Sequence, residues 1–63
     1  MTQKELLYME DAINHEISII SILNKSIEDL DDSDLISFLE DEINVHEELK
    51  ERLLNHMEDK SYE

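Results

Sequence analysis

The amino-acid sequence predicts an all-α protein: an antiparallel two-helix hairpin that dimerises into a four-helix bundle. Three observations predict this fold. The 63 residues contain neither Gly nor Pro, so few points force a helix to break. Apolar residues recur at alternating spacings of three and four, the period of one helix face. Their arc is wider than one antiparallel neighbour covers, so a second hairpin is expected to complete the bundle.

The helix boundaries follow from one polar run. Asp31-Asp32-Ser33-Asp34 is rich in side chains that compete for backbone hydrogen bonds and cap helix N-termini. We therefore expect one helix at about 3–30, a turn at 31–33 and a second helix at about 34–59. Because a chain of this length supports only one small core, residues 1–63 are expected to form a single domain.

The first helix carries one apolar stripe with a single charged residue in it. This residue is Glu16. The stripe consists of Leu6, Met9, Ile13, Glu16, Ile20, Leu23, Ile27 and Leu30. A carboxylate at a position where an apolar side chain is expected needs a counter-charge, a proton or a metal ion, because an unpaired buried charge is costly.

The second helix places two polar residues in its predicted face. These are Glu42 and His46, one helical turn apart. The predicted face consists of Leu35, Leu39, Glu42, His46, Leu49, Leu53 and His56. If the hairpin turns near 31–32, antiparallel geometry sets Glu16 opposite residues 46–48 and Glu42 one turn nearer the loop.

Two interpretations of Glu16, Glu42 and His46 follow. In a symmetric dimer, these residues supply four carboxylates and two imidazoles, a ligand set suited to a pair of iron or manganese ions, with zinc as an alternative. The alternative is a polar core layer in which Glu16 and His46 pair and fix the helix register.

Two further histidines are secondary metal candidates. His15 has Asp11 one turn before it, and we interpret it as a surface histidine in a local charge pair, with an outer-ligand role as the alternative. His56 lies on the predicted face near the bundle end. An imidazole there more often closes a core with a hydrogen bond than it ligates metal.

Composition excludes several function classes. The formal net charge of -13 repels nucleic acid and anionic membranes, so neither is an expected partner. No apolar segment has membrane-spanning length, and the N-terminus lacks the features of a signal peptide, so a cytoplasmic location is expected. The chain has no Cys, which excludes disulfides and thiolate metal sites. No Ser-His-Asp set or glycine-rich phosphate loop is present.

Two segments of the sequence resemble the ferritin-like superfamily, including rubrerythrins, encapsulated ferritins and small spore-coat proteins. The segments are Tyr8-Met-Glu-Asp-Ala-Ile-Asn-His-Glu16 and Phe38-Leu-Glu-Asp-Glu-Ile-Asn-Val-His46. The resemblance implies half of a ferritin-like bundle, with Glu16, Glu42 and His46 as metal ligands completed by a second chain, and with a possible location in an encapsulating compartment or spore coat. In the family pattern, the second Glu precedes the His by three residues, whereas here the gap is four.

Two functions are therefore expected as alternatives. The first is a metal-binding homodimer, with iron oxidation as the activity that the resemblance implies. The second is a non-enzymatic acidic interaction protein, either a coat or scaffold component or a mimic of DNA that blocks a basic protein partner.

Overall fold

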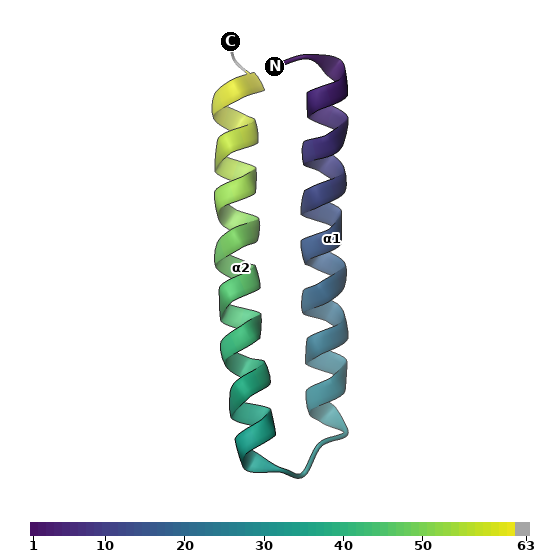
Figure 1. Ribbon diagram of the computed structural model, residues 1–63, viewed down its shortest axis with the longest axis vertical. Helices are drawn as coiled ribbons and strands as arrows, with labels where there is room; N and C mark the ends of the chain where they lie inside the picture. Colours follow the sequence, from purple (N-terminus) through teal and green to yellow (C-terminus); the bar gives the residue numbers. More distant parts are fainter. Residues whose placement is uncertain (62–63) are drawn as a thin grey trace.

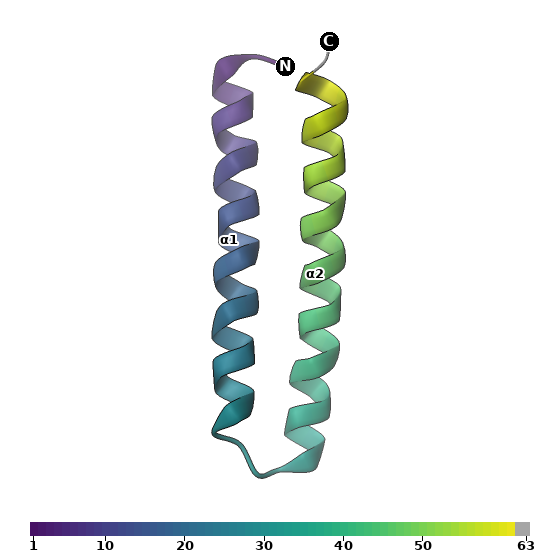
Figure 2. The ribbon, with the colours of Figure 1, turned by 180° about the vertical axis from the view of Figure 1, so that it is seen from behind.

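The computed structural model describes residues 1–61 and consists of two long helices lying side by side in opposite directions. They are α1 (Gln3–Glu28) and α2 (Ser33–Ser61) (Figure 1). The view from behind shows the same pairing, with the start of α1 and the end of α2 at one end (Figure 2). The hairpin measures 48 × 15 × 10 Å. The predicted all-α antiparallel hairpin is confirmed.

α1 begins with a reciprocal cap between Thr2 and Glu5. The Glu5 N–H donates to Thr2 Oγ1 over 3.1 Å, and the Thr2 N–H donates to Glu5 Oε1 over 2.9 Å. These two bonds satisfy backbone donors that the first helical turn leaves without an internal partner. The bond from the Thr2 backbone is the main reason that the pKa of the Glu5 carboxyl is lowered.

The connection between the helices is short and capped on both sides. α1 ends at Glu28, two residues before the expected boundary, and its last turn tightens as the Leu30 N–H donates to the Ile27 carbonyl over 3.2 Å. α2 begins at Ser33, because Asp32 Oδ1 accepts the Leu35 N–H over 3.0 Å and caps the helix. α2 continues to Ser61, two residues beyond the expected end at 59.

The stripe predicted on α1 faces α2, as expected. Its eight residues are all buried or half-buried, whereas their neighbours on the outer side of α1 are exposed. Ile13 and Ile20, at 7% and 8% exposure, are the only buried side chains among the described residues. The core is therefore one narrow seam between two helices, which buries too little apolar surface to make a hairpin robust by itself.

The face predicted for α2 is wrong by part of a turn. Leu35, Leu49 and His56 are exposed, although the spacing placed them in the seam. The half-buried residues that take the inner face are Ile36, Leu39, Ile43, His46, Lys50, Leu53 and Met57. Both stripes share Leu39, His46 and Leu53. The other predicted positions are each replaced by the next residue along the chain, so that the seam holds Ile36, Ile43, Lys50 and Met57 in place of Leu35, Glu42, Leu49 and His56.

Neither helix in the described part of the chain is long and apolar enough to cross a membrane.

Candidate functional site

Glu16 and His46 meet inside the seam, as the antiparallel levels predicted. The His46 Nδ1 lies 2.5 Å from Glu16 Oε2, within hydrogen-bond distance. The two side chains are only 12% and 24% exposed. The Glu16 carboxylate in the apolar seam is thus paired with the His46 imidazole of the facing helix. The second ring nitrogen of His46, Nε2, can make another contact.

Glu42 lies beside this pair rather than in it. It is half-buried, one turn before His46 on α2. Because α2 is turned from its predicted orientation, Glu42 stands at the edge of the seam, next to Ile43, which points inward. The structure therefore brings Glu16 and His46 together and leaves Glu42 on one open side of the hairpin.

The two secondary candidates do not join them. His15 is exposed on α1, next to a shallow surface depression lined by Asp11, Asn14, His15 and Ser18. His56 is exposed near the end of α2, so the expectation that it closes the core is wrong. Within residues 1–61, no group of three or more His, Cys, Asp or Glu side chains is placed to hold a metal ion.

A second feature of α2 was not anticipated as a separate stripe. Leu35, Phe38, Val45 and Leu49 are all exposed, and each precedes a seam residue by one position. One position is a rotation of about 100°, so these side chains form a stripe along one open side of the hairpin, interrupted by Glu42 between Phe38 and Val45. Their alternating three- and four-residue spacing is the signal that could have revealed this stripe from sequence.

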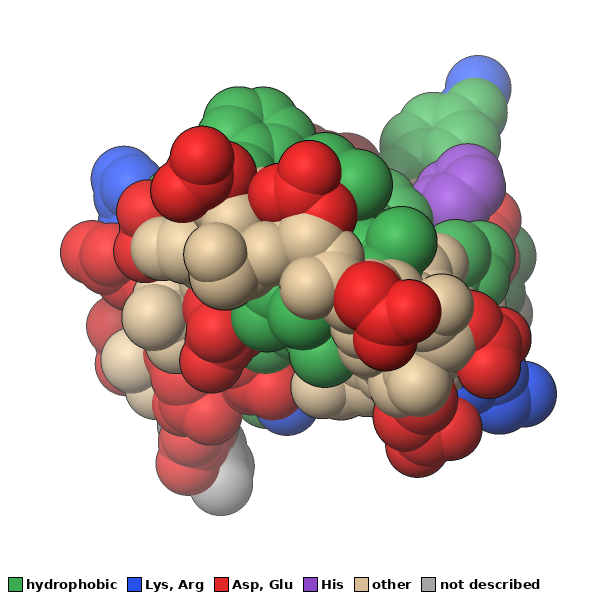
Figure 3. Space-filling model, turned by 90° about the horizontal axis from the view of Figure 1, so that it is seen from below, with side chains coloured by type: hydrophobic (Ala, Val, Ile, Leu, Met, Phe, Trp, Pro, Cys, Tyr) green, Lys and Arg blue, Asp and Glu red, His purple; other side chains and the backbone are tan. Residues whose placement is uncertain are grey.

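α1 adds two exposed apolar residues to the same side. Tyr8 and Ile22 also precede seam residues by one position, and in an antiparallel pair this offset points to the same side from both helices. We call the six residues the apolar face: Tyr8, Ile22, Leu35, Phe38, Val45 and Leu49. Seen from the loop end, hydrophobic side chains gather along the upper side over both helices (Figure 3).

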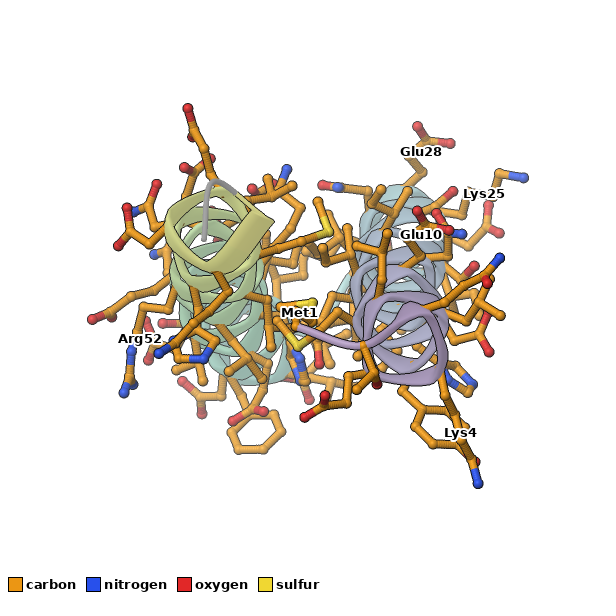
Figure 4. All side chains as sticks on the ribbon, turned by 90° about the horizontal axis from the view of Figure 1, so that it is seen from above. Met1, Lys4, Glu10, Lys25, Glu28 and Arg52 are labelled. Atoms are coloured by element: carbon orange, nitrogen blue, oxygen red, sulfur yellow. The ribbon has the colours of Figure 1, made fainter. Side chains whose placement is uncertain are left out.

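The opposite side of the hairpin is polar and acidic. Glu10 and Glu28 of α1 project to the side opposite Lys4, whose ammonium lies 5.8 Å from the centre of the Tyr8 ring (Figure 4). On α2, the positions that follow the seam by one residue are mostly acidic: Glu40, Glu47, Glu51 and Glu58. A shallow depression here is lined by Asn24, Ile27, Glu40, Ile43 and Asn44. The hairpin thus has one broad side on which most of the exposed apolar residues lie and one that is richer in acidic residues, although Leu7 and Ile17 are exposed there.

Comparison with known proteins finds no match for this chain among family models, curated proteins or solved structures.

Proposed function

We propose that this chain is an acidic helical interaction protein that binds a helical partner through its apolar face. One observation carries the proposal: six of the nine large hydrophobic side chains that are exposed in the described residues lie on one broad side. Contiguous exposed apolar surface of this kind marks an association site in soluble proteins. The acidic remainder of the surface keeps other sides from associating and confines binding to this face.

The partner is expected to present a helix with an apolar stripe. The apolar face consists of side chains from both antiparallel helices, and another helix with an apolar stripe can pack against such a surface. Phe38 and Tyr8, one on each helix, supply the aromatic contact area that dominates such interfaces.

Paired variants test this proposal. The double substitution Phe38→Ser and Leu49→Ser should abolish association, because it removes two large apolar contacts from the face. The matched control is Leu7→Ser with Ile17→Ser, which removes two exposed apolar residues from the other broad side and should leave association intact. The readouts are mass by sedimentation and binding of the hydrophobic dye ANS. The proposal fails if the wild-type chain is a helical monomer that binds no ANS, or if both double variants behave like wild type.

Metal binding is the second candidate function, favoured by the Glu16–His46 contact within the seam. The described chain alone supplies no complete ligand set. A second copy would be needed to bring another carboxylate and imidazole to the same level. Iron or manganese suits a site of carboxylates and imidazole, and zinc accepts the same donors.

Metal analysis tests this second candidate directly. After loading with ferrous iron, manganese or zinc and removal of excess metal, the wild-type protein should retain metal, and Glu42→Ala and His46→Ala should lose it. Glu51→Ala, an exposed glutamate on the acidic side, serves as the control. A chelator should lower the melting temperature of the loaded protein, because a metal that binds only the folded state stabilises it. Wild-type protein that retains no metal would exclude this function.

A further inference from the structure

We propose that the partner of the apolar face is a second copy of this chain, packed face to face about a two-fold axis perpendicular to the helices. In this arrangement α2 lies antiparallel to α2 of the second copy, and the two loops lie at opposite ends of a four-helix bundle. The inference rests on the proposed function, because it names the partner of the same face. It goes beyond that function by fixing the direction and register of pairing.

The distribution of charge along the hairpin selects this direction. Residues 28–41, around the loop, contain seven acidic residues and no basic residue. Four of the five basic residues lie in the half nearer the chain ends: Lys4, Lys50, Arg52 and Lys60. A two-fold axis parallel to the helices would stack both acidic loops together. The perpendicular axis sets each acidic loop beside the less acidic end of the other copy, which gives less repulsion between like charges.

The side of α2 that carries the apolar face can pair with the same side of α2 from a second copy, if the two helices are antiparallel and centred at one height. Read along the helix, this stripe is Leu35, Phe38, Glu42, Val45, Leu49, Arg52 and His56. If the two-fold axis passes midway between Val45 and Leu49, each residue of α2 lies beside the residue of the second copy that is equally far from the axis in the opposite direction along the sequence. The resulting pairs join Val45 to Leu49, Glu42 to Arg52 and Phe38 to His56 of the second copy. Leu35 falls outside this paired core, at the level of Asp59.

α1 supports the same axis independently. The Glu16–His46 contact shows that these two residues share one level, so an axis between Val45 and Leu49 crosses α1 beside His15. Equally distant positions on α1 then meet their counterparts on the second copy. They pair Tyr8 with Ile22, whereas His15 lies at the axis itself. One axis therefore pairs apolar side chains once on each helix, Tyr8 with Ile22 and Val45 with Leu49, and pairs opposite charges at Glu42 and Arg52.

The broad side of the hairpin is large enough for a dimer interface. It spans 48 by 15 Å, a projected area of roughly 700 Å², so an interface of the standard ~800 Å² per partner would occupy most of this side. The same axis brings both Glu16–His46 pairs to the middle of the bundle. It also assigns Glu42 to an ion pair with Arg52 of the second copy, a role different from that of a metal ligand.

Charge exchange tests the register. Glu42→Arg sets two arginines against each other at each contact, and Arg52→Glu sets two glutamates against each other. Each single variant should therefore raise the dimer dissociation constant about tenfold or more. The double variant E42R/R52E restores opposite charges and should dimerise like wild type. A mixture of the two single variants should form the heterodimer preferentially, since each of its contacts joins Arg to Glu.

The matched controls are Glu51→Arg and Lys25→Glu, which make the same charge changes at exposed positions outside the apolar face. Sedimentation gives the dissociation constants, native mass spectrometry counts heterodimers, and circular dichroism checks helicity. Rescue in the double variant and an excess of heterodimer would support the pairing. A dimer that responds to Glu42 and Arg52 no more than to the controls overturns it. A monomer that binds ANS would contradict the proposed dimer, but it would remain consistent with the proposed function, binding of another helical partner. A helical monomer that binds no ANS would contradict both proposals.

Discussion

The Glu16–His46 hydrogen bond joins α1 and α2 at mid-height of the hairpin. Each side chain is mostly withdrawn from water, and each stands where an apolar residue would otherwise complete the seam. A polar pair in this position fixes the height of one helix against the other, because a shift of one turn would leave both groups without a partner. Register, rather than stability, is what this pair contributes.

Replacement of Glu16 and His46 tests whether this pair contributes to register rather than to stability. In chelator-treated protein, Glu16→Leu with His46→Leu should raise the free energy of unfolding by about 1 kcal/mol or more, because leucines fill the seam without desolvating polar groups. Glu16→Ala alone should lower it by about 1–3 kcal/mol, since His46 then loses its partner. Urea unfolding followed by circular dichroism measures both effects. A less stable double-leucine variant would show that the pair is a net stabilising interaction.

At the scale of the helix, the largest difference between the observed and the predicted inner face of α2 is at Lys50. It occupies a seam position near the level of Ile13, with 23% of its side chain exposed. Its Nζ reaches Glu47 Oε2 at 3.2 Å, so the aliphatic stem covers the seam while the ammonium stays at its edge. α2 thus accepts a lysine in the seam and leaves leucines outside it.

Lys50→Leu tests this orientation of α2. The added apolar burial should outweigh the loss of a surface ion pair and raise the free energy of unfolding by about 1 kcal/mol. The comparison variant is Lys25→Leu, which changes an exposed lysine of α1 and should have little effect. Urea unfolding of both proteins provides the measurement. Equal behaviour of the two variants would contradict the position of Lys50 in the seam.

At the scale of the whole molecule, a narrow seam and a broad apolar face lead us to expect that folding and association are coupled. A single hairpin buries only Ile13 and Ile20, whereas covering the apolar face would withdraw six more large side chains from water. If a second copy covers this face, as proposed, the melting temperature of the wild-type protein should rise with protein concentration, because dimerisation stabilises the folded state by mass action. The Phe38→Ser, Leu49→Ser variant should lose that dependence, and the Leu7→Ser, Ile17→Ser control should keep it.

Much of the hairpin was predictable from the residues alone. The helical period, the absence of Gly and Pro, and the capping residues of 31–34 predicted both helices to within a few residues. The level of Glu16 opposite His46 followed from counting outward from the turn. The position of Glu42 did not follow, because it depends on how far α2 is rotated about its own axis. Its proposed roles, and the predicted dimer, stay predictions.

The sequence by itself determined the secondary structure, the turn and the inner face of α1, because α1 carries one dominant apolar stripe with only narrow extensions. Only the tertiary structure decided which face of α2 lies inward, because α2 carries two overlapping stripes that share Leu39, His46 and Leu53. Periodicity weighs these stripes almost equally. Packing against the isoleucines of α1 selects one of them, and Leu35 and Leu49 of the other lie on the surface as part of the apolar face.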